Sequence, residues 1–433
     1  MQTQVPAGAD SGEEGGLLAL AGVAALVGGV AAMLGSGFIR SLEQAARWMA
    51  ALTAWAHGRS AAGSLVLVAV CAGATVFAAR WVRLYSKFAS GSGIPQVEAV
   101  LSGDLPPARR GLILVKFVGG TLAIGAGLAL GREGPCVQMG ADAAFWIGRF
   151  LRRTWADSLV LMAAGAGAGL ATAFNAPIAG AVFVLEELMR RFDTRVTIAT
   201  FAASASAIAV SRLFLGQGPV FHIAAPAYPA FGSLPLYLGL GILAGALGIA
   251  YNRLLLKTLA WADRLRARNA MIFPTGIGAL VGAIAWFRPD LVGGGDAITQ
   301  GVLVGAATLS AVPAVFLLRF ALGPLSYAAQ TPGGLFAPML VLGAQSGWLY
   351  ATVWQHCFPS SDVDPKSFAV VGMAALLTAI VRAPLTGIIL IIEMTNSFAL
   401  LLPMLGACFA AMLLPTLFGN EPIYDSLKAR LLG

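Results

Sequence analysis

The stretch Gly131-Arg132-Glu133-Gly134-Pro135-Cys136-Val137-Gln138-Met139-Gly140 follows an apolar run that ends at Leu130. Its glycines permit a sharp backbone turn, and Pro135 suits the first turn of a helix. The free amides and the positive dipole end at such a helix start attract anions. Glu133 stands where an anion would bind. We therefore expect a break in a membrane segment, followed by a helix that begins at an anion site.

Two interpretations of the charged pair in this stretch remain open at this point. In the functional one, an ionised Glu133 competes with a transported anion for the helix start and withdraws when it is protonated. In the structural one, Arg132 and Glu133 pair with each other or with neighbouring helices, as intramembrane charges commonly do. The rest of the chain has to decide between them.

The composition predicts an all-α polytopic membrane protein. Of the 433 residues, 58% are hydrophobic and 11% are charged, whereas soluble domains carry about 25% charged residues. A helix that crosses the hydrocarbon needs roughly 20 residues, and several apolar stretches are too short or too long for one crossing. We therefore expect broken and re-entrant helices. The apolar stretches are 16–36, 62–79, 111–130, 158–185, 197–216, 233–251, 270–287, 299–323, 333–354, 367–394 and 398–418.

The chain has a formal net charge of +8, and many of its basic residues stand at the ends of apolar segments. This pattern is typical of cytoplasmic loops, or of cations near an anion path, and both are favoured over nucleic-acid binding. The clusters are Arg109 and Arg110, then Arg149, Arg152 and Arg153, then Arg190, Arg191 and Arg195.

Cysteine and histidine usage predicts neither a disulfide framework nor a metal site, and no other cofactor is expected. The four cysteines form no CxxC pair and the three histidines are isolated. Residues 1–15 form a polar tail without the basic start and cleavage pattern of a signal peptide. We therefore expect a retained helix from residue 16.

A second break lies at Phe88-Ala89-Ser90-Gly91-Ser92-Gly93-Ile94-Pro95-Gln96. It is either an ordinary flexible turn or a loop that feeds a helix start, in which Ser92 donates its hydroxyl to a dehydrated anion. Lys116 lies inside the apolar stretch that follows. It either extends to the membrane surface or adds positive potential beneath the anion path.

The chain contains an internal repeat. Residues 161–187 resemble residues 368–394 when Ala176-Pro177 is aligned with Ala383-Pro384. The domain boundaries that follow are a first half at 16–218, a connecting loop at 219–235 and a second half at 236–433, in which Gly293-Gly294-Gly295 is a further flexible break. Two glycine-opened helix starts at matching positions favour a transporter with its binding site near the membrane midplane. The other matched residues are Gly165 with Gly372, Leu170 with Leu377, Gly180 with Gly387, Glu186 with Glu393, Pro135 with Pro338, Gly140 with Gly343 and Ala141 with Ala344.

Four elements together resemble the CLC family of chloride channels and proton/chloride exchangers. They are Gly91-Ser92-Gly93-Ile94-Pro95, Gly131-Arg132-Glu133-Gly134-Pro135, Gly333-Gly334-Leu335-Phe336-Ala337-Pro338, and Tyr424 at the start of the last short helix. The resemblance implies a homodimer of inverted-repeat subunits, each with its own anion pathway in the lipid bilayer. The expected type is a prokaryotic exchanger in the bacterial inner (plasma) membrane. The cytoplasmic regulatory domains of many relatives are not expected here.

The resemblance also implies where chloride binds. The hydroxyls of Ser92 and Tyr424 are expected to contact the central anion. Backbone amides at Leu335, Phe336 and Gly134 complete the site. Leu335 stands where the family usually has isoleucine, a conservative change at a position that acts through its backbone.

The family's proton-handling roles fall on two glutamates. Glu133 is expected to be the external gate and proton acceptor, and Glu187 to transfer protons on the internal side. Arg132 and Lys116 are expected to support the anion path. Chloride is then a bound substrate.

These expectations lead to one function and two rivals. The predicted function is secondary active exchange of chloride for protons. The nearest rival is a passive chloride channel of the same family, gated by voltage or protons, which Glu187 disfavours. A remote rival is an intramembrane hydrolase that uses Ser92 with His57, for which the surrounding sequence lacks a nucleophile-elbow pattern.

Overall fold

The protein is described by a computed structural model that covers residues 10–109, 111–223, 228–229 and 231–433. Within these ranges it is built from helices, with two isolated β-bridges and no β-strand. The first half contains α1 Asp10–His57, α2 Ser60–Tyr85, η1 Lys87–Ala89, α3 Ile94–Leu101, α4 Leu112–Gly125, α5 Glu133–Phe150, α6 Trp155–Phe174, α7 Pro177–Phe183, the π-helix η2 Val184–Leu188 and α8 Thr194–Leu215. After it come η3 Phe231–Ser233, α9 Leu234–Arg268, α10 Ile272–Phe287, η4 Pro289–Leu291, α11 Asp296–Val304, α12 Val312–Tyr327, α13 Phe336–Cys357, α14 Pro365–Val381, α15 Pro384–Thr395, η5 Phe398–Leu400, α16 Leu401–Leu417 and α17 Ile423–Leu432.

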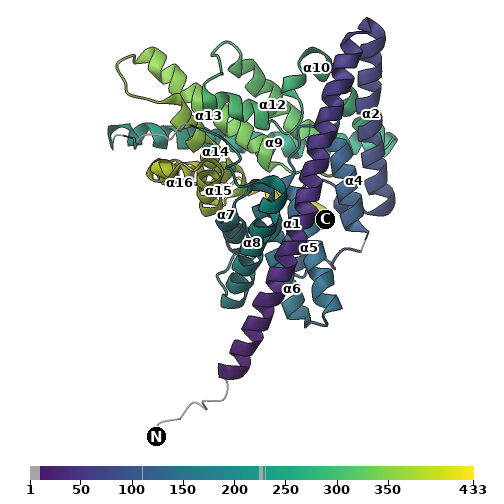
Figure 1. The fold of residues 1–433 in the computed structure, drawn as a ribbon. Helices are drawn as coiled ribbons and strands as arrows, with labels where there is room; N and C mark the ends of the chain where they lie inside the picture. The colour runs from purple at the N-terminus through teal and green to yellow at the C-terminus, as the bar shows by residue number, and fades with distance from the viewer. Residues whose placement is uncertain (1–9, 110, 224–227, 230) are drawn as a thin grey trace.

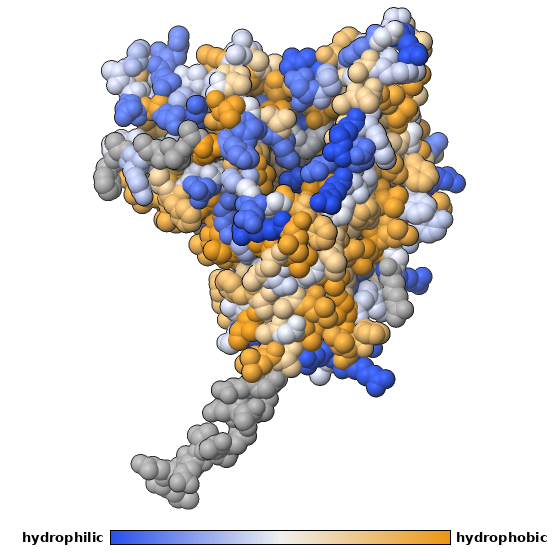
Figure 2. Space-filling model, viewed as in Figure 1, coloured by the Kyte–Doolittle hydropathy of each residue, from blue (hydrophilic) through white to orange (hydrophobic). Residues whose placement is uncertain are grey.

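The helices have the lengths and polarity of a membrane protein, as the composition predicts. In the described ranges, six helical segments are long and apolar enough to cross a membrane, and five shorter apolar helices accompany them. Figure 2 shows hydrophobic side chains gathered over the middle and lower part of one face, with hydrophilic side chains at its top. The all-α polytopic prediction is therefore confirmed.

The predicted breaks occur inside the long apolar stretches. The stretch 158–185 divides into α6 and α7, and the stretch 367–394 divides into α14 and α15. At each division one residue adopts a left-handed conformation, Asn175 with φ 52° and Arg382 with φ 73°. An Ala-Pro pair follows each of them and starts the next helix. The stretch 299–323 is also broken, between α11 and α12.

Helix α1 is much longer than the apolar pattern indicates. Its first residue is Asp10, inside the predicted tail 1–15, and it continues through His57 instead of ending near residue 36. Residues 1–9 lie outside the described residues. Hydropathy could not find the second part of α1 because it carries charged residues such as Arg40, Glu43 and Arg47. In Figure 1, α1 runs the length of the molecule and ends beside α2.

The two repeats have the same local packing. Helices α5 and α6 cross at Gly140 and Gly165, where a Cβ on either glycine would lie 2.3–2.4 Å from the carbonyl oxygen of the other. Helices α13 and α14 cross in the same way at Gly343 and Gly372. These four residues are two of the three matched glycine pairs of the sequence repeat. Their missing side chains let the two backbones of each pair approach closely, as is common between membrane helices.

A reciprocal contact joins the repeats. The Glu186 carboxylate accepts hydrogen bonds from the amides of Leu385 and Thr386 at the start of α15, at 3.0 and 2.7 Å. The Glu393 carboxylate accepts from Ile178 and Ala179 at the start of α7, at 3.1 and 2.8 Å. Each repeat thus caps a helix of the other with the matched glutamate, which satisfies amides that have no partner within their own helix.

The glycine crossing yields a stability prediction. Gly343→Ala should lower the free energy of unfolding by about 1–3 kcal/mol relative to Gly276→Ala, because its Cβ would lie 2.6 Å from the Gly372 carbonyl oxygen. Gly276 is also helical, but a Cβ at that position would have no neighbouring atom within 4 Å. The unfolding midpoints of the two purified variants in detergent measure the difference. Equal midpoints would contradict the proposed crossing.

Candidate functional site

Three loops from distant parts of the chain are joined by backbone hydrogen bonds at the centre of the molecule. They precede α3, α5 and α13. Gly131 and Gly334 exchange two bonds, with N to O distances of 2.8 and 2.7 Å. Gly91 donates to Thr331 and accepts from Gly333, both at 3.0 Å. The starts of these three helices, two in the first half and one in the second, are therefore held at one place.

The Lys116 side chain holds the loop that precedes α3. Its side chain is fully buried, and Nζ donates to the carbonyl oxygens of Ala89 at 3.1 Å and Gly91 at 2.7 Å. Of the two interpretations of this lysine, extension to the membrane surface is therefore wrong. The Lys116 amino group thus lies against the loop that carries Ser92.

Two hydroxyl groups face each other at this centre. Ser92 and Tyr424 are fully buried and lie close to each other. Within the described part of the chain, neither hydroxyl oxygen has a hydrogen-bond partner. Gly134, the second residue of α5, lies directly against Ser92. A Cβ at position 134 would lie 2.5 Å from the Ser92 Oγ. The Ser92 amide donates to the Tyr327 hydroxyl at 3.3 Å.

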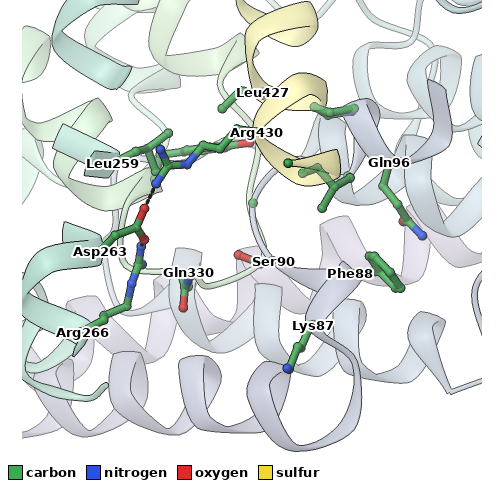
Figure 3. Close-up of a pocket in the computed structure, with 16 residues that line it drawn as sticks. Lys87, Phe88, Ser90, Gln96, Leu259, Asp263, Arg266, Gln330, Leu427 and Arg430 are labelled. Atoms are coloured by element: carbon green, nitrogen blue, oxygen red, sulfur yellow. Dashed lines mark hydrogen bonds and ion pairs between the residues drawn. The ribbon is translucent and has the colours of Figure 1, made fainter. Parts of the chain in front are cut away.

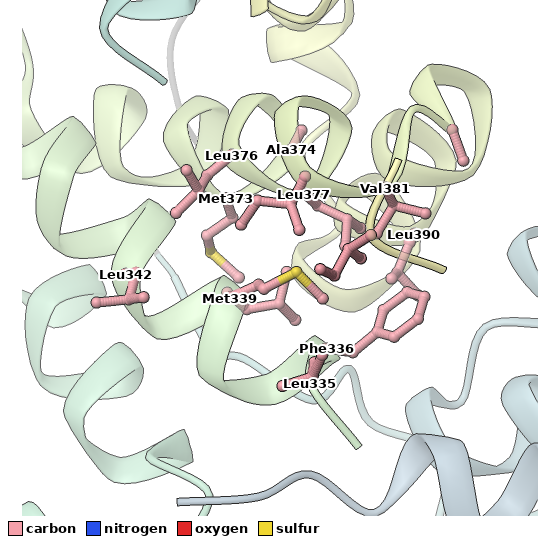
Figure 4. Close-up of a cluster of buried hydrophobic side chains, with 14 of the residues drawn as sticks. Leu335, Phe336, Met339, Leu342, Met373, Ala374, Leu376, Leu377, Val381 and Leu390 are labelled. Carbon is pink, nitrogen blue, oxygen red and sulfur yellow. The ribbon is translucent and has the colours of Figure 1, made fainter. Parts of the chain in front are cut away.

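The start of α13 is surrounded by apolar side chains. Leu335 immediately precedes the helix and Phe336 is its first residue, and both are buried (Figure 4). The Phe336 ring lies 6.2 Å from the Tyr424 ring and 6.0 Å from the Phe183 ring, centroid to centroid. Electrostatic interactions are strengthened in such surroundings because water is excluded.

The Glu133 carboxylate lies where two helices begin. It is beside the backbone amides of Glu133 itself and of Ala337, in the first turns of α5 and α13. Its Oε2 has no hydrogen-bond partner among the described residues. The carboxylate folds back over Gly131, where a Cβ would lie 2.0 Å from Oε2. Glu133 therefore fills a place where helix amides from both repeats converge.

Arg132 pairs with a different carboxylate. Its Nη1 lies 3.7 Å from Asp296 Oδ2, at the start of α11. Arg132, Glu133 and Asp296 all line a cavity of about 370 Å³, which we call the gate-side pocket. Arg132 and Glu133 therefore do not form an ion pair with each other, whereas the pairing of Arg132 with a neighbouring helix, also part of the structural interpretation, is present.

Glu187 lies on the π-helix that follows α7. Glu186 caps α15, whereas Glu187 is buried at 3% exposure, with Oε1 3.9 Å from Arg190 Nη2. Its Oε1 has no hydrogen-bond partner in the described ranges.

Several charged residues around Glu187 were not predicted from the sequence. Glu98 of α3 is buried at 5% exposure, and its Oε1 lies 3.6 Å from Arg190 and 3.7 Å from Lys428 of α17. Arg190 also pairs with Asp425. These ion pairs tie the helix that carries Tyr424 to the segment that carries Glu187. The sequence feature that could have indicated this cluster is Glu98, a lone charged residue in the apolar helix that follows Ser92.

A second cavity, of about 530 Å³, includes Ser90 and Gly91 in its wall. Asp263 pairs there with Arg266 of the same helix and with Arg430 of α17 (Figure 3). We call it the basic pocket. Residues of the joined loops thus line two separate cavities.

His57 does not belong to this site. It is exposed at the end of α1, where its Nε2 lies 2.8 Å from the Trp286 carbonyl oxygen. Ser92 is fully buried and contacts Tyr327, Tyr424 and Gly134. The pairing that a serine hydrolase would require is absent from the described residues.

Comparison with known proteins agrees with this arrangement. The family model described as voltage gated chloride channel matches residues 74–415. The chain belongs to this family, the CLC proteins. It is 35% identical to the H(+)/Cl(-) exchange transporter ClcA of Citrobacter koseri, over 96% of this chain and 89% of the relative. A ClcA of Salmonella arizonae is 36% identical over 81% of this chain and 76% of the relative.

Solved CLC structures have the same fold. A slow cyanobacterial Cl-/H+ antiporter superposes with a TM-score of 0.91 and 33% identity, covering 95% of this chain and 98% of the other. A CLC-type fluoride/proton antiporter superposes with a TM-score of 0.80 over 94% and 97%; at 20% identity it supports the fold alone. The inverted-repeat CLC fold and an integral membrane location are therefore established for this chain.

The site geometry predicts a role for one hydroxyl. Ser92→Ala should weaken chloride binding about tenfold or more, because a hydrogen bond to a charged group contributes roughly 1.5–3 kcal/mol. Isothermal titration of the purified CLC protein with chloride measures the Kd. Ser204→Ala is the matched control, since Ser204 on α8 is another buried hydroxyl without a hydrogen-bond partner in the described ranges. An unchanged Kd for Ser92→Ala, or equal losses in both variants, would contradict the assignment.

Proposed function

We propose that this protein exchanges chloride for protons across a membrane. The observation that carries the proposal is the position of the Glu133 carboxylate, which lies beside amides at the starts of α5 and α13. A carboxylate held in this way occupies the position of an anion. The relatives named as H(+)/Cl(-) exchange transporters, and the structural neighbour named as a Cl-/H+ antiporter, support the same function.

The binding of chloride is proposed to involve the groups that lack partners. The hydroxyls of Ser92 and Tyr424 are buried donors without acceptors in the described structure. An anion between them would satisfy both, together with the amides of Leu335, Phe336 and Gly134. Buried polar groups without partners are costly, so such an anion is held without further rearrangement.

Coupling follows from competition at Glu133. When the carboxylate is ionised it fills the place at the helix starts and excludes chloride. When it is protonated it loses its charge and its attraction to the amides, so chloride can enter. The protonation of Glu133 and the passage of chloride are thereby linked, and the exchange direction is the one that the relatives' names give.

Glu187 is proposed to pass protons between Glu133 and the cytoplasm. It is buried beside Arg190 and near the helix that carries Tyr424, so it lies at the side of the anion path and not within it. The run of Arg190, Arg191 and Arg195 supports a cytoplasmic position for this end. Protons and chloride would therefore share the route near Glu133 and separate toward the cytoplasm.

The rival is a passive chloride channel, which the name of the matched family model also covers. The buried carboxyl group of Glu187 favours the exchanger. A reversal potential that is independent of the pH gradient would establish the channel instead.

The assembly is proposed to be a homodimer in the bacterial plasma membrane. Ile178 at the start of α7 and Leu385 at the start of α15 are matched residues of the two repeats, and they are 50% and 46% exposed. They give the cross-capped helices an apolar outer face that a second subunit can cover within the bilayer. The bacterial origin of the named relatives supports the location.

Removal of the gate should separate the two fluxes. Glu133→Ala should leave chloride flux running while proton movement falls to background, because the helix starts stay accessible to chloride and the proton acceptor is gone. Liposome fluxes of chloride and protons, measured together under opposed gradients, test this. Proton pumping by Glu133→Ala against a proton gradient, driven by chloride, would contradict the mechanism.

Neutralising the internal glutamate should have a narrower effect. Glu187→Gln should abolish proton transport and preserve chloride transport, because the side chain keeps its size but cannot carry a proton. Glu393→Gln is the control: it weakens a helix cap at a half-buried charged residue but lies outside the proposed proton route. It should lower the thermal stability in detergent and leave the proton-to-chloride ratio unchanged. Loss of coupling in both variants would remove the specific role of Glu187.

A further inference from the structure

The gate-side pocket has an unexpected charge for the mouth of an anion path. Its charged lining residues in the described structure are Arg132, Glu133, Glu43 and Asp296. Three carboxyl groups therefore face one guanidinium. The rest of the lining consists of glycines and apolar residues, with Thr53 as a further polar side chain. An arriving anion meets one attractive charge that carboxylates already surround.

Asp296 is placed beside Arg132 by a rigid loop. Arg319 is buried at 1% exposure and donates to the carbonyl oxygens of Leu291, Gly293 and Gly294, at 3.2, 2.7 and 2.8 Å. The Gly293 amide also donates to the Gly127 carbonyl oxygen at 2.7 Å. The loop that the sequence suggested to be flexible is therefore bound tightly, and it presents Asp296 at the start of α11.

Asp296 and Glu43 reach Arg132 from different elements. Asp296 Oδ2 lies 3.7 Å from Arg132 Nη1, and Glu43 on α1 also acts on the guanidinium electrostatically. Asp296 is half exposed and Glu43 is exposed, so salt in solution screens both. Neither of them contacts Ser92, Tyr424 or the amides at the start of α13 in the described structure.

The basic pocket has the opposite balance. Its charged side chains are Lys87, Arg266, Arg430 and Asp263, three cations against one carboxylate. A chloride ion is therefore attracted to one mouth of the proposed path and opposed at the other. Potentials of this kind change local ion concentrations and entry rates without altering the central binding site.

We propose that Asp296, assisted by Glu43, forms an electrostatic barrier that lowers the apparent chloride affinity at the gate-side mouth. By occupying Arg132, Asp296 reduces the attraction that this guanidinium offers to incoming anions. Chloride transport is then asymmetric, with a higher KM from the gate-side pocket than from the basic pocket. The inference rests on the exchange function proposed above and names a residue that tunes chloride entry.

The test uses vesicles of both orientations from expressing cells that lack their own chloride exchangers. Right-side-out and inverted vesicles present opposite mouths to the outside, so initial chloride uptake gives a KM for each mouth. Asp296→Asn should lower the KM about two- to fivefold in one orientation only, a change typical of an exposed ion pair. The change should shrink as ionic strength is raised with an impermeant salt. Asp290→Asn removes a carboxylate from the exposed pair with Arg288, outside both pockets, and should change neither KM.

A second variant controls for a folding defect in Asp296→Asn. Glu43→Gln lies on another helix and should shift the same KM in the same direction, by a smaller factor. The proposed barrier would be overturned if all three variants had the KM of the parent protein. Equal KM shifts in both orientations would also overturn it, as would a shift that salt does not reduce. The parent protein separates this result from failure of the proposed function, because loss of the exchange function appears as uncoupled chloride and proton fluxes before any substitution is made.

Discussion

The backbone hydrogen bonds between Gly131 and Gly334, and those of Gly91 with Thr331 and Gly333, are the constraint on which the rest of the structure depends. They join loops that are separated by up to about half of the chain and belong to both repeats. Each loop ends where a helix begins, so the bonds fix three helix starts around one point. Free amides at helix starts carry partial positive charge. The fold thereby concentrates positive potential at its centre with few charged side chains.

Glycine lets the helix starts approach one another, and burial strengthens their interaction with a charge. Gly134 has no side chain, so α5 can begin against Ser92, and Lys116 supports the same loop through two carbonyl oxygens. The apolar side chains around the start of α13 exclude water, which strengthens every interaction with a charge at the centre. The unpartnered oxygens of Ser92, Tyr424 and Glu133 are costly in such surroundings unless an ion or a proton satisfies them. A single acidic side chain that can either bind a proton or take the place of an anion is the simplest occupant of such a site.

Much of this arrangement could be predicted from the sequence, because the signals are local. Glycine and proline mark the loops before α3, α5 and α13, and the shared Ala-Pro pairs mark the breaks after Asn175 and Arg382. The family resemblance assigns roles to Ser92, Glu133, Glu187 and Tyr424, which the fold brings toward one region. Those roles remain proposals, whereas the CLC fold and family are established.

The remaining features depend on contacts between distant residues. The length of α1 was missed because the apolar pattern ends where charged residues begin, although the helix continues. One of these residues, Glu43, lines the gate-side pocket. The π-helix at Glu186 and Glu187 has no sequence signature, and the different partners of these neighbouring carboxylates are seen only in the fold. The roles of Arg319 and Asp296 also required the fold, because Gly293 to Gly295 resemble a flexible turn until a buried guanidinium is seen to bind their carbonyl oxygens.

The central claim is that an anion and the Glu133 carboxylate use the same place at the helix starts. Crystals of the parent protein and of Glu133→Gln, grown in bromide, test it most directly by the anomalous scattering of that ion. We expect bromide between Ser92 and Tyr424 in both proteins, and an additional bromide beside the Ala337 amide only in Glu133→Gln. Bromide far from all three helix starts, or the same bromide sites in both proteins with position 133 remote from them, would contradict the claim.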